Sequence, residues 1–339
     1  MASDMIQSIT IEGFKSIHSI KDFPLRPINL LIGANGSGKS NFLEAFVFLN
    51  ECMEGRKDDY VERNGGADKI LHFGSKTTLK LNLNIFSSNC TGRGAHLEYA
   101  RDDKLIGRLI GATTEGGWVG TKSPSFRRYQ FHDTGFHSPL KKTNQLDDNR
   151  SLRPDGSNLA SFLYLLKQRY RESFDLVRKT VQQVAPFFED FMLEPLARNP
   201  DTIKLEWRHK RSDSEWDSWD FSDGTLRFIA LATLFLQPVE LRPSVILVDE
   251  PELGLHPYAI GLLASLIKQA SIDTQVIAAT QSPLLLDYFD PEDILVANRV
   301  DGETKIERLA PGPLAEWLKD YSLGQLWEKG ELEGRPGKE

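Results

Sequence analysis

Long apolar segments are missing from this chain of 339 residues. A membrane-spanning helix needs roughly 20 consecutive apolar residues, and no stretch approaches that length. The N-terminus lacks the apolar segment of a signal peptide. The two cysteines, Cys52 and Cys90, are too few for a disulfide framework and lack metal-ligand spacing. These absences argue against a transporter with fused membrane spans, and we expect a protein of the reducing cytoplasm with no membrane partner.

Internal repeats, low-complexity segments and sustained heptads are also absent, and the last of these excludes a long coiled-coil arm. The length allows one large or two ordinary domains with a real core.

A phosphate-binding loop of the pattern G-x-x-x-x-G-K-[ST] occupies residues 33–40. An apolar run over 28–32 precedes it and a helix-like run over 41–49 follows, which is the strand–loop–helix context that the pattern needs. In such a loop, backbone N–H groups and the helix N-terminus point at phosphate oxygens. Lys39 would reach the β- and γ-phosphates, and the Ser40 hydroxyl would ligate Mg²⁺. The loop residues expected to bind a nucleoside triphosphate are Gly33, Asn35, Gly36, Ser37, Gly38, Lys39, Ser40 and Asn41.

Two acidic residues follow a second apolar run, at 244–248. A short continuous apolar run is typical of a buried parallel strand, and ligands bind at the carboxyl ends of such strands. Asp249 would therefore help to hold Mg²⁺, and Glu250 would polarise the attacking water.

Two further polar groups stand at informative positions. Gln281 follows an apolar strand at 275–279, and Ser222 opens a strongly helical run that ends near Gln237. Ser222 can cap this helix and leave a positively polarised N-terminus for an anion. On its own, a Ser-Asp-Gly sequence such as the one that begins at Ser222 is common in turns. Its order and spacing relative to the other motifs make it informative.

Together these motifs resemble the ABC-type ATPases of the RecF, SMC and OLD group, the SMC-like or AAA-21 predicted bacterial ATPases. Residues 5–17 look like the family's opening strand and its Phe-Lys-Ser turn, residues 221–225 stand at its signature, and residues 247–257 look like its acidic motif and D-loop. The resemblance implies an α/β fold of the ABC-type P-loop NTPase kind, with a mixed or parallel sheet core and an inserted α+β lobe.

The same resemblance implies a head-to-head homodimer, or a higher assembly, that sandwiches ATP. Its cofactors would be ATP and Mg²⁺. Lys15 and Ser16, like Ser222, Asp223 and Gly224, would then bind nucleotide, the last three in the partner's site. Catalysis would rest on Glu250, Gln281 and Lys39. Two positions depart from the family pattern: Asp223 replaces the first signature glycine, and Gln281 replaces the more usual histidine and cannot carry a proton charge. No convincing Q-loop glutamine follows the strand at 79–86.

The expected layout is a discontinuous ATPase domain (1–86 and 212–310), an inserted lobe (87–211) and a tail (311–339). Strands are expected at 6–12, 28–32, 79–86, 96–101, 126–131, 203–208, 244–249, 275–279 and 293–297. Helices are expected at 38–50, 157–169 with Ser157 as cap, 171–184, 222–237 and 257–270. The apolar tail segment 316–327 is a packed element or a partner-docking one, and packing is favoured.

Basic side chains concentrate in the middle of the chain. Residues 122–211 carry 17 basic and 11 acidic side chains, whereas residues 212–339 carry 10 and 23. Tyr129, Phe131 and Phe136 are interleaved with the first basic residues. This composition fits DNA or RNA contact at the inserted lobe, and it fits an ordinary solvated surface equally well.

The leading hypothesis is an ATPase whose ATP-driven dimerisation controls an effector in DNA maintenance or anti-phage defence. No acidic Toprim cluster stands out after residue 297, so a nuclease would be a separately encoded chain. The alternative is a nucleotide- or DNA-sensing scaffold that binds ATP with little turnover. A GTPase is disfavoured because no Asn-Lys-x-Asp motif follows the phosphate loop.

Overall fold

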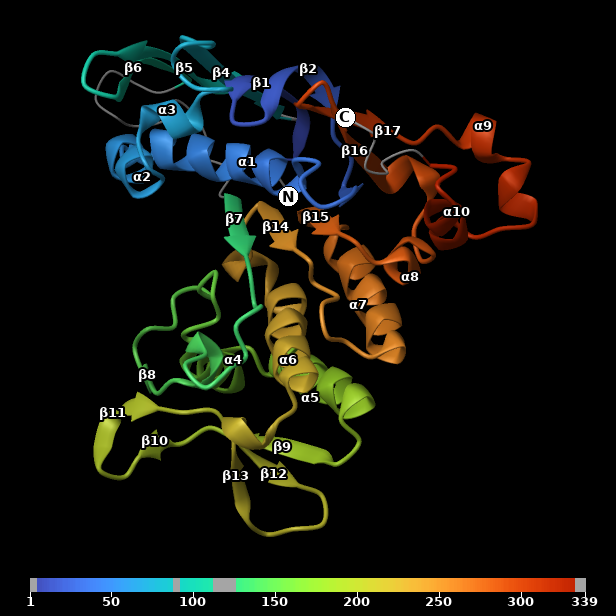
Figure 1. The fold of residues 1–339 in the computed structure, drawn as a ribbon. Coiled ribbons are helices and arrows are strands. Elements are labelled where there is room, and N and C mark those ends of the chain that lie inside the picture. The colour runs from blue at the N-terminus through green and yellow to red at the C-terminus, as the bar shows by residue number, and fades with distance from the viewer. Residues whose placement is uncertain (1–4, 88–91, 112–125, 333–339) are drawn as a thin grey trace. The chain divides into compact units, whose positions relative to one another are not determined.

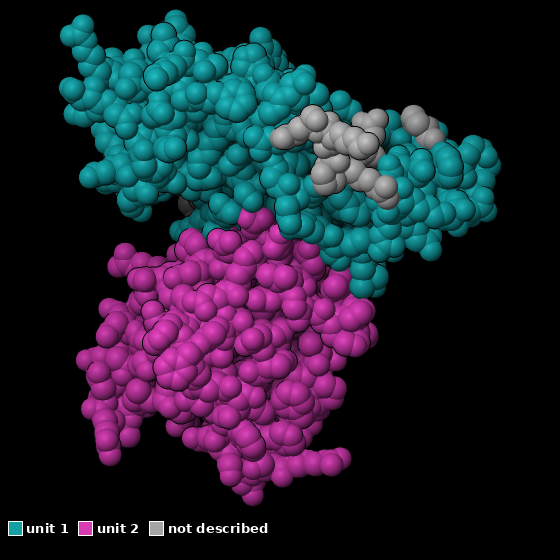
Figure 2. All heavy atoms as spheres, in the orientation of Figure 1, with its two compact units in different colours: residues 1–128, 243–247, 274–339 teal, residues 129–242, 248–273 magenta. Residues whose placement is uncertain are grey.

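The computed structural model describes residues 5–87, 92–111 and 126–332 (Figure 1). The chain divides into two compact units, coloured separately in Figure 2. The first comprises residues 1–128, 243–247 and 274–339, and the second comprises residues 129–242 and 248–273. Within the described ranges, no helix is long and apolar enough to span a membrane.

The first unit contains an antiparallel sheet in the order β2-β1-β4-β5-β6. Along β4, buried and accessible residues alternate because successive side chains point to opposite faces. Leu81, Leu83 and Ile85 therefore enter the core while Asn82 and Asn84 lie on the other face. The strands are β1 (Ile6–Phe14), β2 (Ile17–Pro24), β4 (Lys80–Ser87), β5 (Gly92–Ala100) and β6 (Lys104–Ile110).

A six-stranded sheet has the order β17-β16-β3-β15-β14-β7. β3 pairs in parallel with β15 and β16, and β16 pairs antiparallel with β17, so the sheet is mixed. Every residue of β3, β14 and β15 is buried, which explains why these strands are continuous apolar runs. The strands are β3 (Ile28–Ile32), β7 (Phe126–Tyr129), β14 (Val245–Asp249), β15 (Gln275–Thr280), β16 (Ile294–Val300) and β17 (Glu303–Arg308).

Helix α1 (Lys39–Met53) follows the phosphate loop and packs in the core of the first unit. Its buried Phe42 and Phe46 belong to one apolar cluster with Ile11 and Leu83 of the antiparallel sheet and Ile277 of the mixed sheet. Figure 1 shows α1 lying between these two sheets. The start of α1 is thereby fixed at the carboxyl end of β3. The other helices are α2 (Lys57–Arg63), α3 (Ala67–Ile70), α8 (Pro283–Leu286), α9 (Pro311–Leu314) and α10 (Leu323–Lys329).

The tail packs at α10. Leu323 and Leu326 are buried, α10 contacts α8, and the Gly324 N–H donates to Asp287 Oδ1 over 2.6 Å. A capping box of Ser322 and Gln325 begins the helix. The packing expected for this part of the tail is present.

The second unit combines helices with two three-stranded sheets, ordered β10-β11-β8 and β13-β12-β9. Its core is aromatic: Trp207 and Phe221 stack with ring centroids 4.6 Å apart. The helices are α4 (Leu159–Arg169), α5 (Arg171–Val184), α6 (Asp223–Leu236) and α7 (Pro257–Ala270). The strands are β8 (Asn144–Gln145), β9 (Phe188–Met192), β10 (Pro195–Leu196), β11 (Asn199–Ile203), β12 (Glu206–His209) and β13 (Glu215–Asp217).

Some local expectations differ from the structure. The strand expected at 203–208 is split between β11 and β12, and Asn158 rather than Ser157 is the N-cap of α4. Asn158 is fully buried, and its amide bonds Asp148 O, Ser151 O and the Arg153 N–H, so it fixes the preceding loop. The lobe boundary expected at residue 87 falls inside the antiparallel sheet, because β5 and β6 extend β4.

Candidate functional site

The phosphate loop connects β3 to α1 through two glycines with positive φ, Gly36 at 78° and Gly38 at 99°. Gly38 is the N-cap of α1, and no side chain hydrogen-bonds to the first turn from that position. The first backbone N–H groups of a helix have no intrahelical partner, so this start suits an external anion. Ser37 Oγ is buried and has no hydrogen-bond partner among the described residues. A buried hydroxyl of this kind fits a ligand rich in oxygen acceptors.

Lys39 lies over this loop. Its Nζ donates to Gly33 O over 2.6 Å and to Ala34 O over 3.0 Å, and the residue is 6% exposed. Asn35 and Ser40 are exposed at the loop surface. The structure therefore brings the loop residues together between β3 and α1, with Lys39 buried and Ser40 exposed.

The Phe-Lys-Ser turn lies beside the loop. Lys15 has φ 48° and its Nζ pairs with Glu44 over 2.7 Å, so its charge is engaged within the unit. Ser16 Oγ accepts a hydrogen bond from Asn41 Nδ2 over 2.6 Å and lies 2.7 Å from Thr304 Oγ1. The turn is therefore tied to the start of α1.

Thr304 and Arg299 contact the loop and were not expected from the sequence. Thr304 Oγ1 donates to Ser37 O over 3.0 Å, and Arg299 Nη1 donates to Gly36 O over 3.3 Å. They come from β17 and β16, more than 260 residues from the loop. No local pattern signals them, since β17 itself was not expected.

Gln281 follows β15, the parallel neighbour of β3. Because Thr280 pairs with Ile32, Gln281 and Gly33 leave adjacent strands at the same level. Gln281 is exposed, and Ser282 caps α8 through the Leu285 N–H over 3.2 Å. This position suits a side chain that reads a ligand held at the loop.

The acidic pair lies at the end of β14. Asp249 is 7% exposed, and its backbone carbonyl accepts a hydrogen bond of 2.8 Å from His132 Nε2. Glu250 has φ 42°, a left-handed conformation that L-residues with long side chains rarely adopt. Such backbone strain concentrates at functional positions. His132, which the sequence did not single out, positions this strand end.

The signature helix α6 begins as its sequence predicts. Ser222 is the N-cap, and its Oγ accepts from the Thr225 N–H over 3.2 Å. The Asp223 carboxylate is exposed and lies 3.9 Å from Lys141 Nζ. Gly224 lies against the D-loop, where a Cβ would come within 2.5 Å of Gly254 O. The three signature residues thus stand at an accessible helix N-terminus within the second unit.

Arg227 connects this helix start to two loops and was missed by sequence analysis. Its guanidinium donates to Phe131 O and His132 O over 2.9 Å each, and it also hydrogen-bonds Leu253 O. Burial lowers the pKa of the Arg227 guanidinium from its usual range. Because all three acceptors are backbone carbonyls, Arg227 fixes the spacing of α6, the D-loop and the segment before Asp133.

The groups proposed for magnesium fit that ion by type. Ser40 supplies a hydroxyl and Asp249 a carboxylate, the hard oxygen ligands that Mg²⁺ takes together with phosphates and water. The described residues contain no group of three or more His, Cys, Asp or Glu side chains placed to hold a metal. A magnesium site that is completed by triphosphate oxygens does not need such a group of three side chains.

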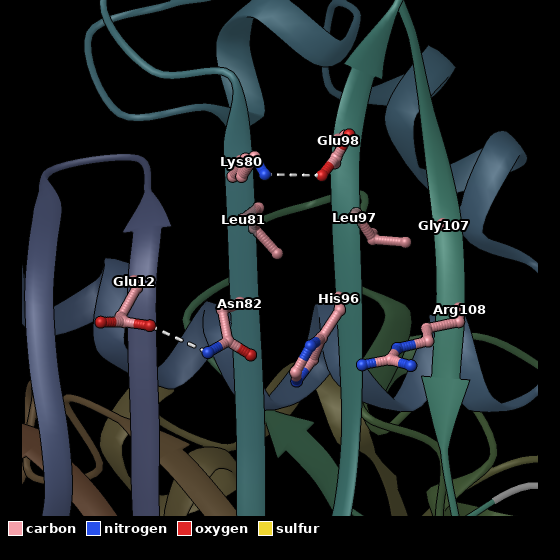
Figure 3. A pocket seen from close by; sticks show the side chains of 9 residues that line it. All are labelled: Glu12, Lys80, Leu81, Asn82, His96, Leu97, Glu98, Gly107 and Arg108. Carbon is pink, nitrogen blue, oxygen red and sulfur yellow. Dashed lines mark hydrogen bonds and ion pairs between the residues drawn. The ribbon is translucent and has the colours of Figure 1, made fainter.

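A groove of about 610 Å³ lies elsewhere, on the accessible face of the antiparallel sheet (Figure 3). Glu12, Asn82, His96 and Arg108 face one another across four neighbouring strands. Asn82 Nδ2 donates to Glu12 Oε2 over 2.8 Å, and Lys80 pairs with Glu98 beside it. No residue of the phosphate loop lines this groove.

The basic segment is less available for nucleic acid than its composition suggests. Tyr129 and Phe131 are buried core residues at 1% and 3% exposure, so neither can stack on a base, whereas Phe136 is 76% exposed. Several of the cations are paired with carboxylates: Arg153, Arg171, Arg178 and Arg208. Lys122 lies outside the described residues.

Two family profiles match the chain. Residues 118–287 match the family described as "AAA domain, putative AbiEii toxin, Type IV TA system", and residues 5–169 match the family described as "AAA ATPase domain".

Curated relatives are more distant. An OLD nuclease of Thermus scotoductus is 22% identical over 84% of this chain and 60% of its own length. The Septu protein PtuA of Bacillus mycoides is 25% identical over 90% of this chain and 42% of its own length. The chain spans less than two thirds of either relative.

Solved structures with the same fold include an Smc head bound to the C-terminal winged-helix domain of ScpA. It has a TM-score of 0.64 and 18% identity, and the match covers 92% of this chain and 99% of that one. An Smc head with an extended coiled coil, bound to the C-terminal domain of ScpA from Pyrococcus furiosus, has a TM-score of 0.60 and 16% identity, over 93% and 98% of the chains. These likenesses show the fold, an SMC head-like P-loop NTPase fold of the α/β class, as the motifs predicted.

Proposed function

The chain belongs to the family described as "AAA domain, putative AbiEii toxin, Type IV TA system", and from that premise we propose that it binds and hydrolyses ATP, dimerises around it and thereby controls a separate effector. The observation that carries the proposal is the phosphate loop. A buried Lys39 and a glycine N-cap stand at the start of the 15-residue helix α1, and the N-cap residue makes no side-chain hydrogen bond to the first turn.

Each loop group has a role in binding. The glycine turn directs N–H groups at the phosphates, and Lys39 exchanges its carbonyl contacts for phosphate oxygens. Ser40 and Asp249 hold Mg²⁺, which would neutralise charge on the phosphates when it is bound. The fixed cation and the helix start together favour a triphosphate over a neutral ligand.

Hydrolysis requires a base and a sensor of the terminal phosphate. Glu250 accepts a proton from the attacking water, and its carboxylate is held at the strained end of β14. Gln281 hydrogen-bonds the γ-phosphate or that water through its amide, without adding charge. Lys39 stabilises negative charge on the transferred phosphoryl group.

The second half of the site comes from another copy of the chain. The accessible N-terminus of α6, with Ser222, Asp223 and Gly224, covers the nucleotide held by the partner's phosphate loop. A hydroxyl cap at a 14-residue helix presents partial positive charge to an anion. Asp223 weakens this contact relative to a glycine, because its carboxylate repels phosphate.

The effector is a separately encoded nuclease in anti-phage defence or DNA maintenance. The support is the similarity to two relatives named OLD nuclease and Septu protein PtuA. DNA or RNA contact is proposed at the basic segment, where Phe136 is exposed while Tyr129 and Phe131 are buried.

A nucleotide-sensing scaffold is the second candidate, and Asp223 is the observation that favours it. If the repulsion at Asp223 prevents closure, the chain binds ATP as a single subunit and turns it over rarely. Light scattering with ATP separates the two candidates, because only the first predicts a doubling of mass.

The test of the proposal is nucleotide binding and turnover. Lys39→Ala should abolish measurable ATP binding in calorimetry, because it removes the cation of the loop. Lys80→Ala is the matched control, since that cation pairs with Glu98 on the antiparallel sheet and has no role assigned at the loop. Unchanged affinity in Lys39→Ala would refute the loop assignment.

A further inference from the structure

A chain of hydrogen bonds behind the phosphate loop connects three side chains to one loop carbonyl. Asn41 Nδ2 donates to Ser16 Oγ over 2.6 Å, Ser16 Oγ lies 2.7 Å from Thr304 Oγ1, and Thr304 Oγ1 donates to Ser37 O over 3.0 Å. We call Asn41, Ser16, Thr304 and the Ser37 carbonyl the hydroxyl chain. All four belong to the first unit.

The direction of each hydrogen bond in the hydroxyl chain follows from the number of hydrogens that each group can donate. A hydroxyl has one hydrogen to donate. Thr304 gives its hydrogen to Ser37 O, so Ser16 must donate to Thr304 Oγ1, and Ser16 in turn accepts from the Asn41 amide. In the hydroxyl chain each group therefore donates to the next, from Asn41 through Ser16 and Thr304 to Ser37 O.

The end point of the chain sets the orientation of one peptide. The described backbone has no cis peptide bond, and in a planar trans peptide the C=O and N–H point in opposite directions. Thr304 holds the Ser37 carbonyl behind the loop, so the N–H of Gly38 points to the other side. That N–H belongs to the N-cap of α1, among the groups that would meet a phosphate.

Packing fixes Thr304 itself. The residue is 1% exposed, and its backbone N–H donates to Ser16 O over 2.8 Å. A Cβ added to Gly38 would lie 1.9 Å from Thr304 Oγ1 and 2.8 Å from its Cβ. The threonine side chain occupies the space that the glycine leaves, so the hydroxyl has no room to turn elsewhere.

We propose that Thr304 of β17, acting through Ser16, is a positioning residue that orients the Gly38 N–H toward the β-phosphate of a bound nucleotide. The proposal rests on the proposed function for its ligand. A purely structural role would affect the fold as a whole. The proposed role confines the effect to the Thr304 hydroxyl and the Gly38 N–H.

The first experiment compares Thr304→Val, which keeps the shape, with Thr304→Ser, which keeps the hydroxyl. If Thr304→Val misplaces only the Gly38 N–H, ATP and ADP binding should weaken equally, by about three- to tenfold. KM should then rise more than kcat falls. Thr304→Ser should stay within twofold of the unmodified protein. Thr233→Val is the matched control, because it deletes a buried hydroxyl that bonds Ile229 O inside α6.

The second experiment tests the chain without nucleotide. Hydrogen exchange in the loop peptide containing Ser37 and Gly38 should accelerate in Thr304→Val and in Ser16→Ala, and the double variant should add little to either change. Thr304→Ser should exchange as the unmodified protein does. Additive effects of Ser16→Ala and Thr304→Val would overturn the one-way chain.

The outcomes separate this inference from the proposed function. If the unmodified protein binds no ATP, the proposed function is wrong. The hydrogen-exchange measurement still tests the role of Thr304 in that case. ATP affinity in Thr304→Val equal to that of the unmodified protein, or an equal loss in Thr304→Ser, overturns the inference and leaves the function standing.

Discussion

Gly224 and Gly254 approach each other backbone to backbone: a Cβ on Gly224 would lie 2.5 Å from the carbonyl oxygen of Gly254. Gly254 in turn has φ 73° and would place its own Cβ 2.6 Å from Arg227 Nη1. The start of the signature helix and the D-loop are therefore one packed element within the second unit. A change at either glycine alters both.

Gly224→Ala should lower the free energy of unfolding by about 1–3 kcal/mol, because the methyl group meets a backbone atom that cannot move freely. Gly312→Ala is the control, since nothing lies within 4 Å of its added Cβ. Thermal unfolding of both variants checks this prediction. Equal midpoints would mean that the helix and the D-loop separate at little cost.

The shared site needs a signature variant that leaves the D-loop undisturbed, and Ser222→Asp provides one. Aspartate keeps the N-cap bond to Thr225 N–H but places a negative charge toward the partner's phosphates. The variant should bind ATP in its own loop and fail to hydrolyse it. Ser222→Asn, which caps without charge, should retain activity.

Mixing Ser222→Asp with Lys39→Ala should restore one intact site per heterodimer, because each variant supplies the half that the other lacks. ATPase assays of the mixture, with heterodimers verified by mass, test this complementation. A mixture as inactive as its parents would exclude the sandwich and favour the scaffold.

Glu250→Gln should retain ATP binding while turnover falls by a factor of about 10² to 10⁴, the range for losing a general base. The amide keeps the shape of the carboxylate and loses the proton acceptor. Steady-state phosphate release together with calorimetry distinguishes chemistry from binding. Turnover within a few-fold of the unmodified protein would place the base elsewhere, with Glu252 the nearest carboxylate that is not assigned to Mg²⁺.

Asn82→Ala should destabilise the first unit in a pH-dependent way. The hydrogen bond from Asn82 and then Lys21 hold the pKa of Glu12 below its ordinary value of 4.5. A carboxyl group whose pKa is lower in the folded state stabilises the fold at pH values above its unfolded-state pKa. That contribution is lost as the pH falls through the folded-state pKa. The stability difference between the variant and the unmodified protein should therefore be constant well above the unfolded-state pKa of Glu12 and shrink as the pH falls through the lower folded-state pKa.

Asn64→Ala is the control for this prediction. Asn64 Nδ2 donates to the backbone carbonyl of Tyr60 rather than to a titratable side chain. Its effect on urea unfolding should not depend on pH over the acidic range. A flat profile for Asn82→Ala as well would show that Glu12 does not depend on this amide.

Elements defined by local chemistry were predictable. The loop at 33–40, the cap at Ser222 and the helix from Pro257 to Ala270 agree with the structure because glycine turns, capping hydroxyls and apolar periodicity act within a few residues. The buried strands around 28–32 and 245–249 were recognisable for the same reason, since strands covered on both faces are apolar throughout.

What the sequence did not reveal depends on distant pairing. Thr304 contacts the loop because β17 pairs with β16 and its first residues reach the Ser16 turn, across 288 positions of sequence. Arg227 and His132 act through backbone carbonyls, which carry no sequence signal of their own. Asn158 stands at the N-cap position of α4 without a side-chain cap hydrogen bond, because its buried amide is engaged with Asp148 O, Ser151 O and the Arg153 N–H of the preceding loop.

Lys39 Nζ donates to carbonyl oxygens of its own loop, including those of Gly33 and Ala34. On the proposed function, an entering ligand competes with the loop itself for the ammonium group. A ligand with a single weakly charged oxygen gains little by displacing two short hydrogen bonds, whereas adjacent phosphates gain a charge-assisted contact in exchange. These contacts of Lys39 therefore favour ligands that offer several anionic oxygens, whatever base the nucleotide carries.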